Sequence, residues 1–382
     1  MDNLASDTRF MEYYRRNLAG LMVWLDSEEN DYRKRVIPLA EYQPAIGFAI
    51  VAFAAQHGWG GYPLGDVAAM AESARDKCLQ LIQTRAKEMT EKVAEGVELN
   101  SQSDIADAEW MLASILIINN YENARCRLEA AEGHRQAART IVNIFNHSVS
   151  IEGRELFGFL RNQLAIEDII AATTTFDENH IMNAIAPAPG SDSLLFSKYL
   201  TLLHQITVQS TTQTGAESAE GHLTMSMVHS QFEQARGATL MAAGRLGLGG
   251  STMARDFVRL VDIYHNAGLL YAFRCLKCAG EESPHWVTAS TKLFGQLSEF
   301  EDLNGFVQNL AWPTFIAGTA CHGNAERQGI ILSMFTAIYA VTKFDYYLDA
   351  VDFLKSFWVG LNVDWRSLVQ AREVSGKRLL VV

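Results

Sequence analysis

The sequence has little proline and few cysteines. Its 382 residues include seven prolines and five scattered cysteines. So few prolines leave long stretches in which a helix can continue, because proline removes a backbone hydrogen bond from a helix interior. An odd, scattered set of cysteines is unlike the dense disulfide frameworks of small secreted domains. We therefore expect long helices and a reducing compartment.

The sequence also lacks a long hydrophobic run. The longest apolar runs, residues 45–55 and 111–118, are well short of the ~20 residues that cross a bilayer. No cationic N-terminal segment is followed by an apolar stretch and a small-residue cleavage site. These absences predict buried core helices in place of membrane spans and no membrane partner. We expect an intracellular protein, nuclear or cytoplasmic.

Positive charge is scarce as well. The formal net charge is −12, whereas nucleic-acid binding depends on lysine and arginine side chains that replace counterions on phosphates. The one dense basic run is Arg33-Lys34-Arg35, which we interpret as a solvated helix face. We therefore expect no direct nucleic-acid binding by this chain.

Helix-forming residues are abundant, and apolar residues recur at helical spacing in successive segments. These patterns predict helices over residues 10–26, 66–97, 104–119, 125–145, 156–175, 194–205, 222–243, 253–276 and 285–300, and a helical hairpin or a kinked helix over residues 37–56. Convincing period-2 segments are missing, so the predicted fold is all-α. We expect one multi-helix domain of packed antiparallel helices over residues 1–382. Within residues 183–255 the composition changes, which predicts either a break between two helical subdomains or a set of surface loops.

The stretch that begins at Leu310 organises the C-terminal part of the chain. Proline suits the first turn of a helix, and the residue before it favours an extended conformation. Pro313 therefore predicts a short apolar helix over residues 313–320, entered from an extended Trp312. A break at 321–324 follows, and Asn324 is placed to cap the next helix, with Glu326 in its first turn. Apolar spacing predicts two further helices that pack against one centre.

Both ends of the chain carry a family resemblance. The C-terminal part contains, in order, Trp312-Pro313, FIAG at 315–318, an arginine near a helix start, Phe344-Asp345-Tyr346-Tyr347, Phe357-Trp358 and Asp364-Trp365-Arg366. The N-terminal part contains Tyr13-Tyr14, Leu25-Asp26, Asn30, Tyr32-Arg33, Ile37-Pro38-Leu39-Ala40 and Pro44-Ala45. In this order and separation, the two sets resemble the regulatory domain found behind binuclear zinc-cluster DNA-binding domains in fungal transcription factors. The resemblance covers roughly residues 10–370.

The resemblance implies an all-α module that senses a small molecule or a partner and controls a DNA-binding region elsewhere. The zinc cluster of that family needs six cysteines in a short basic segment, and this sequence contains no such segment. We expect either that the DNA-binding part lies outside this sequence or that the natural protein lacks it. The resemblance leaves activator or repressor action undecided, and a homodimer is left open.

Two short motifs carry weak chemical signals. Residues 244–250 read GRLGLGG, but the preceding segment is helical, whereas a dinucleotide-binding loop follows a strand. We therefore predict a loop there. Cys275 and Cys278 form a CxxC, but no second pair completes the four ligands of a structural zinc site. We predict two core cysteines, no metal site and no cofactor.

Candidate site residues come from the aromatic and histidine-containing segments. The ligand-binding candidates, for a small apolar molecule held between helices, are Trp312, Phe315, His322, His265 and Tyr346. An alternative function is an enzyme that cyclises or isomerises an apolar metabolite in a fungal secondary pathway. For that alternative the candidate acid or base groups are His265, His322 and Asp262. For each residue, structural packing or hydrogen bonding is the competing interpretation.

Overall fold

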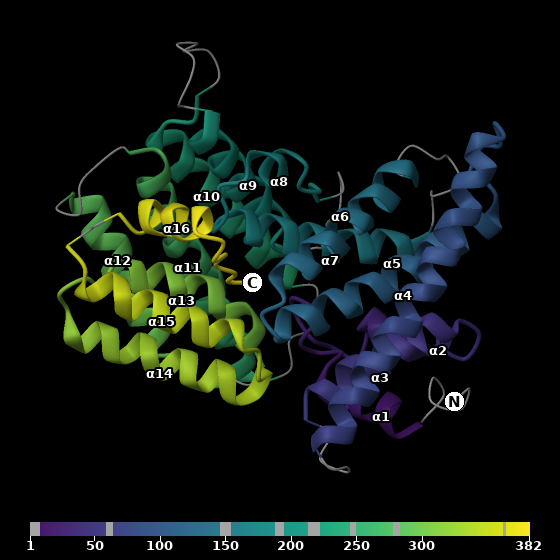
Figure 1. Cartoon of the computed structure of the whole chain (residues 1–382). Coiled ribbons are helices and arrows are strands. Elements are labelled where there is room, and N and C mark those ends of the chain that lie inside the picture. Colours follow the sequence, from purple (N-terminus) through teal and green to yellow (C-terminus); the bar gives the residue numbers. More distant parts are fainter. Residues whose placement is uncertain are drawn as a thin grey trace. The chain divides into compact units, whose positions relative to one another are not determined.

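A computed structural model describes residues 8–58, 64–145, 154–187, 195–212, 222–244, 250–277, 283–303, 305–361 and 364–382. Within these ranges every regular element is a helix and there is no strand (Figure 1). The predicted all-α fold is therefore confirmed. Residues 245–249 of the GRLGLGG motif, including Gly247 and Gly249, and Cys278 lie outside the described residues.

The chain divides into two compact units, residues 1–164 and 165–382. The division falls inside helix α7, Glu155–Ala172. The break that the sequence predicts within residues 183–255 is a separate expectation, and it stays a prediction.

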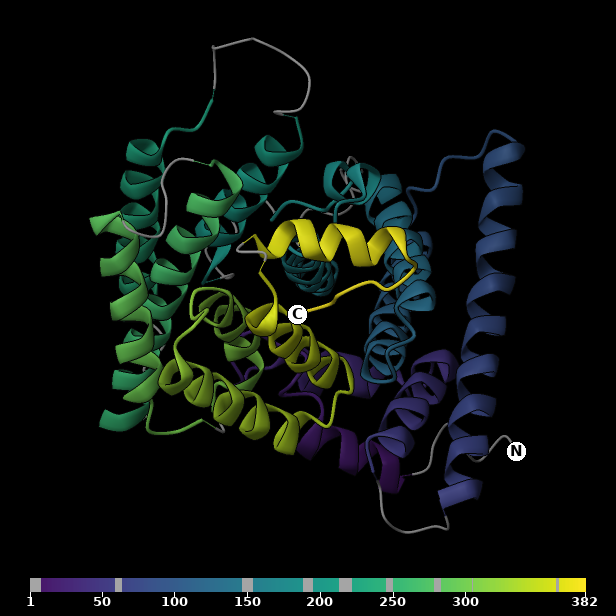
Figure 2. The same cartoon turned by 60° about the vertical axis from the view of Figure 1, so that its left-hand side comes forward.

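The N-terminal unit is built around two buried helices. Its elements before α7 are α1 (Thr8–Asn17), the π-helical turn η1 (Tyr32–Val36), α2 (Ile37–Leu39), α3 (Pro44–Gln56), α4 (Leu64–Ala94), α5 (Gln102–Ala124) and α6 (Leu128–Phe145). Helix α3 is buried from Ala45 to Ala55 because its sequence is apolar on every side, and it packs against α1, α4 and α5. Helix α4, with 31 residues, is long and runs well past α3 (Figure 2).

The predicted helix over residues 10–26 is wrong in length, since α1 ends at Asn17. The following loop is fixed by its own polar contacts. Asn30 Nδ2 donates to the Ala19 carbonyl and to Asp26 Oδ1, both at 2.9 Å. Arg33 then binds Asp26 through two N–H groups. These bonds satisfy the backbone and side chains in a compact loop, which local helix propensity does not anticipate.

The predicted interruption of the helix within residues 37–56 lies between Leu39 and Pro44. The helical segments Tyr32–Leu39 and Pro44–Gln56 are bent by 119° relative to each other at this break. In the described part of the chain no single helix is long and apolar enough to span a membrane, and this bent pair meets that test by length and composition only.

The C-terminal unit is organised around α11. After α7 its helices are α8 (Glu178–Met182), α9 (Ser197–Thr212), α10 (Met225–Ala243), α11 (Ser251–Cys275), α12 (Pro284–Ser298), α13 (Val307–Thr319), α14 (Ala325–Thr342), α15 (Tyr346–Val359) and α16 (Trp365–Val374). Helix α11 contacts α9, α10, α12 and α13, and helices α13, α14 and α15 all contact one another. The latter three lie side by side in Figures 1 and 2. Two helices that follow the organising stretch thus pack against one centre, as predicted.

The predicted helix start at Pro313 is wrong. Helix α13 begins at Val307, so Trp312 is helical and Pro313 lies in the helix interior. An interior proline frees the carbonyl four residues earlier, here that of Asn309. Tyr264 of α11 donates its hydroxyl hydrogen to this carbonyl at 2.8 Å. A tertiary hydrogen bond therefore replaces the missing helical one and lets the helix continue through Pro313.

The predicted cap of α14 is confirmed. The Asn324 side chain accepts a hydrogen bond from the Arg327 N–H at 3.0 Å, and Glu326 lies in the first turn. Gly323, just before the cap, has a φ of +73°, a conformation in which glycine carries no steric penalty.

Candidate functional site

Trp312 contacts several segments of the C-terminal unit. Its indole is buried, and Nε1 donates to Thr173 Oγ1, just after α7, at 2.8 Å. The indole stacks on Tyr264, with ring centroids 5.8 Å apart and planes 22° apart. The edge of Tyr271 meets it at 6.0 Å. Trp312 therefore ties together the end of α7, α11 and α13.

A line of polar side chains continues from Tyr271. The Tyr271 hydroxyl lies 2.8 Å from Thr207 Oγ1 of α9. One turn further along α11, the Cys275 thiol lies beside the hydroxyls of Tyr271 and Ser210. Ser210 Oγ accepts a hydrogen bond from Arg366 Nη2 at 2.9 Å. We call this set the Trp312–Arg366 row: Trp312, Tyr271, Thr207, Cys275, Ser210 and Arg366.

Arg366 places a positive charge at the end of this row. Its guanidinium lies over the Phe176 ring, 5.1 Å from the centroid, and its side chain is half-buried. Burial raises the pKa of Tyr271 and of the Cys275 thiol, so both are neutral at pH 7 and supply no negative charge. The negative charge of Asp364 acts to raise the pKa of both Arg366 and Arg274. The described residues place no carboxylate within ion-pair distance of Arg366, and its buried Nε–H has no acceptor among them.

The C-terminal residues hold the loop that carries Thr173 and Phe176. Glu373 of α16 accepts hydrogen bonds from Thr175 Oγ1 and from the Phe176 N–H, both at 2.9 Å. Thr174 Oγ1 donates to the Leu379 carbonyl at 3.0 Å. The loop between α7 and α8 is therefore positioned by α16 and by the segment that follows it.

Two of the predicted residues, His265 and Asp262, lie on α11 and are engaged by α10. His265 Nε2 is 3.4 Å from Glu233 Oε1, and Asp262 Oδ1 is 2.5 Å from Arg236 Nε. Burial lowers the pKa of His265, against the opposing effect of Glu233. The structure therefore brings these two candidates together as parts of a polar seam between α10 and α11.

The other predicted residues have separate neighbours. Phe315 of α13 packs against Phe353 of α15 and the edge of Trp365 of α16. His322 Nε2 lies 2.9 Å from the Gly360 carbonyl.

Tyr346 donates its hydroxyl to Tyr347 Oη at 3.0 Å and lies 3.2 Å from the Val382 carbonyl. Of the five predicted ligand contacts, Trp312 and Phe315 share helix α13, and the ligand-binding role of all five stays a prediction. Sequence reasoning missed the polar members of the Trp312–Arg366 row. Arg366 was visible only as the last residue of the closing Asp-Trp-Arg motif.

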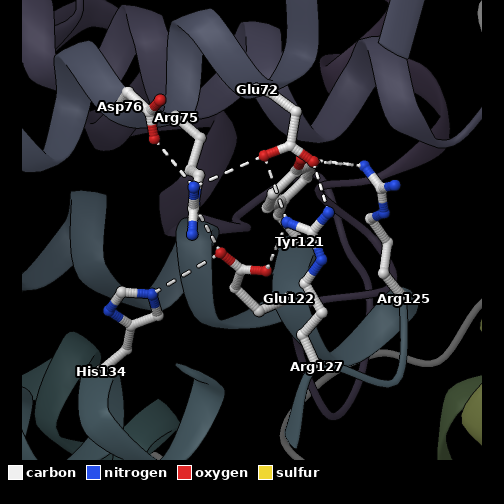
Figure 3. A network of polar contacts seen from close by, with 8 residues as sticks. All are labelled: Glu72, Arg75, Asp76, Tyr121, Glu122, Arg125, Arg127 and His134. Atoms are coloured by element: carbon white, nitrogen blue, oxygen red, sulfur yellow. Dashed lines mark hydrogen bonds and ion pairs between the residues drawn. The ribbon is translucent and has the colours of Figure 1, made fainter. Parts of the chain in front are cut away.

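The N-terminal unit contains a second cluster, built around the fully buried Glu122 of α5 (Figure 3). Arg75 Nε of α4 lies 2.7 Å from Glu122 Oε1, and Arg127 Nη1 lies 3.4 Å from Oε2. His134 Nε2 of α6 is 4.0 Å from Oε1. Burial alone would raise the pKa of Glu122, but His134 and the two arginines bring it below its ordinary value.

Glu72 of α4 supplies the second carboxylate of this cluster. It binds Arg125 Nη1 at 2.8 Å and Arg127 Nη2 at 2.5 Å. We call the residues drawn in Figure 3 the Glu122 network: Glu72, Arg75, Asp76, Tyr121, Glu122, Arg125, Arg127 and His134. Three arginines face three carboxylates, so the network is charge-matched and joins α4, α5 and the start of α6.

The basic run near the N-terminus is charge-matched as well. Arg33 binds Asp26, Lys34 binds Glu29, and Arg35 binds Asp31 and Glu155. The run lies on η1, and each of its side chains has a carboxylate partner. It therefore offers phosphate groups little unpaired positive charge.

Metal-binding groups are not gathered in the part of the chain that the structure describes. Within those residues, no three side chains of histidine, cysteine, aspartate or glutamate are grouped as a metal ion requires. Cys275, Cys78 and Cys321 are buried free thiols, and Cys126 is an exposed one.

Comparison with protein families identifies a family to which the chain is similar. The model of the fungal specific transcription factor domain matches residues 9–204 and 192–381, and so nearly the whole chain. No curated protein and no solved structure matches significantly.

Proposed function

This chain belongs to the family of fungal specific transcription factor domains, and on that premise we propose that it regulates transcription by responding to a small molecule. A regulatory role in transcription follows from the family itself. The response to a small molecule, and its location in the C-terminal unit, are our proposal.

The observation that carries the proposal is the Trp312–Arg366 row. It joins α9, α11, α13, α16 and the loop after α7 through Trp312, Tyr271 and Ser210. A ligand that binds more tightly to one arrangement of these helices than to another would shift the balance between the two arrangements. A row that touches five segments is suited to pass such a shift through the unit.

We propose that DNA is contacted by another region of the same protein or by another polypeptide. The chain carries a formal net charge of −12, and its densest basic run is paired with carboxylates. We propose that it acts in the nucleus through a DNA-binding region in the same protein or in a partner, and that it belongs to the control of a fungal secondary pathway.

A reporter assay tests this function. Residues 1–382 are fused to a heterologous DNA-binding domain in a fungal host, and transcription is compared with the DNA-binding domain alone. We expect reporter transcription to change on fusion and to respond to extracts of secondary-metabolite cultures. Trp312→Phe, which keeps an aromatic ring but removes the donor to Thr173, should alter the response at unchanged protein level. Reporter activity equal to that of the DNA-binding domain alone, with the fusion expressed, would contradict the proposal.

The enzyme alternative stays a prediction. His265 and Asp262 each face a charged partner on α10, which is a geometry that structural pairing also produces. Turnover of a pathway intermediate by the purified chain, and its loss in His265→Asn, is the measurement that would favour the enzyme.

A further inference from the structure

We propose that Arg366 is the recognition point for a carboxylate group on the small molecule, an inference that rests on the proposed function. The site consists of the Arg366 guanidinium, its packing partner Phe176 and the hydroxyl row that begins at Ser210. The ligand class is a small organic acid with an apolar body.

The first argument is charge. Three other half-buried arginines of this chain are paired with a carboxylate at close range: Arg75 with Glu122, Arg236 with Asp262 and Arg372 with Asp349. A cation held away from water without a counter-ion is costly, which is why buried charges in proteins are normally paired. Within the described chain the Arg366 guanidinium contacts a hydroxyl and an aromatic ring, whereas the nearby Asp364 carboxylate accepts from the Arg366 backbone N–H at 3.1 Å and acts on the guanidinium only electrostatically. An anion supplied from outside would complete it.

The second argument is the direction of the hydrogen bonds in the row. Thr207 Oγ1 donates to the Leu203 carbonyl, so the Tyr271 hydroxyl is the donor in its 2.8 Å contact with Thr207. Ser210 Oγ donates to the Thr207 carbonyl and accepts from Arg366 Nη2. Every hydroxyl hydrogen of the row is therefore used, whereas Arg366 keeps unused N–H donors. An incoming group must be an acceptor.

The third argument is the shape of the available donors. The Arg366 Nε–H is buried and finds no acceptor among the described residues. In a guanidinium, Nε–H and one Nη–H point the same way, and their spacing matches the two oxygens of a carboxylate. Phe176 covers one face of the guanidinium and Ser210 holds Nη2, so the plane of the fork is fixed before a ligand arrives.

Benzoate is the probe, and benzamide, which has the same shape without the charge, is its control. Binding of each to the purified full chain is measured by titration calorimetry, with the thermal unfolding midpoint as a second readout. We expect benzoate to bind at least tenfold more tightly than benzamide. Arg366→Gln should abolish the preference for benzoate, and Arg366→Lys, which keeps the charge but loses the fork, should weaken benzoate binding at least tenfold.

Arg327 provides a matched control. Its Nη1 donates to Ser290 Oγ at 2.9 Å and its guanidinium lies over the Phe294 ring at 4.7 Å, so its contacts resemble those of Arg366. Its N–H groups are not among the buried donors without acceptors. Arg327→Gln should leave benzoate binding within twofold of the wild type.

Three outcomes would overturn the inference: equal binding of benzoate and benzamide, no binding of benzoate by the folded wild type, or equal losses in the Arg366 and Arg327 variants. Circular dichroism shows whether Arg366→Gln is folded, and if it is not, Arg366→Lys decides. The reporter assay is independent of this result. A fusion that responds to extracts while benzoate fails to bind would retain the proposed function and remove the carboxylate site.

Discussion

The Glu122 network and the Trp312–Arg366 row differ in how the charges of their arginines are paired. Each joins several helices of its unit through polar side chains. In the Glu122 network every arginine meets a carboxylate, so the charges are matched inside the protein. In the row the charge of Arg366 meets hydroxyl, thiol and aromatic groups. The first cluster is therefore charge-matched within the protein, whereas the second would be completed by the carboxylate that we propose as its ligand.

The largest expected effect comes from breaking the Glu122 network. Glu122→Gln leaves Arg75 and Arg127 without their buried partner, and loss of one member of a buried pair costs about 3–5 kcal/mol. The free energy of unfolding is measured by urea titration, with hydrogen exchange of α5 amides to assign the loss to the N-terminal unit. Asp76→Asn is the control, because that carboxylate is 66% exposed and its removal should cost less than about 1 kcal/mol. Equal losses in the two variants would mean that burial of Glu122 does not set its contribution.

A smaller effect is expected at the proline of α13. Tyr264→Phe leaves the Asn309 carbonyl without its donor, which should cost about 1–3 kcal/mol. Pro313→Ala restores an N–H that can donate to that same carbonyl. In the Pro313→Ala background, Tyr264→Phe should therefore cost less than in the wild type, and the double-mutant cycle measures the difference. Strictly additive losses would show that Tyr264 does not compensate for Pro313.

Acid should affect the two units in different pH ranges. Burial lowers the pKa of His204, His229 and His265 in the C-terminal unit. Folding favours the neutral forms of these histidines. Their contribution to stability is therefore lost as the pH falls below about 6.5, because the unfolded chain then binds more protons than the folded chain.

In the N-terminal unit the pKa of Glu72 is lowered, first by its hydrogen bond with Arg127, and that of Glu122 is lowered as well. Their stabilisation is present above the ordinary glutamate pKa of about 4.3 and is lost as the pH falls further. Hydrogen exchange, corrected for the intrinsic pH dependence, should therefore show α11 opening at a higher pH than α5. Opening of α5 first would reverse the comparison.

The smallest effect is expected at the basic run. The Lys34 and Glu29 side chains are 48% and 78% exposed, so their ion pair is screened by water. Lys34→Gln should change the free energy of unfolding by less than about 1 kcal/mol. It should also leave affinity for a DNA duplex at background, as measured by fluorescence anisotropy. A loss of several kcal/mol in the free energy of unfolding would mean that the basic run contributes to stability as the Glu122 network does.

The parts of the fold that could be predicted are those set by local sequence. The apolar character of α3 and α5 predicts buried helices, and Asn324 predicts a cap, because each depends on residues a few positions apart. The start of α13 could not be predicted, because the helix continues through Pro313 only with the help of Tyr264, far away in the sequence.

The candidate site shows the same limit. Trp312 could be selected from its own type and motif, and it proves to be the buried centre of the C-terminal unit. Arg366 could not be selected in this way, because the role that we propose for it depends on the groups that surround its guanidinium. The identity of these groups depends on which of α9, α11 and α16 come together, and the sequence order of these helices does not reveal it.

The position of helix α7 limits where the chain can be cut into recombinant fragments. Because it runs without interruption across residues 164 and 165, a recombinant fragment cut at that border would expose unpaired amides on one side and unpaired carbonyls on the other. Its final turn leads directly into Thr173, which accepts the Trp312 hydrogen bond. A shortened C-terminal fragment should therefore begin before Glu155, so that it contains the whole of helix α7.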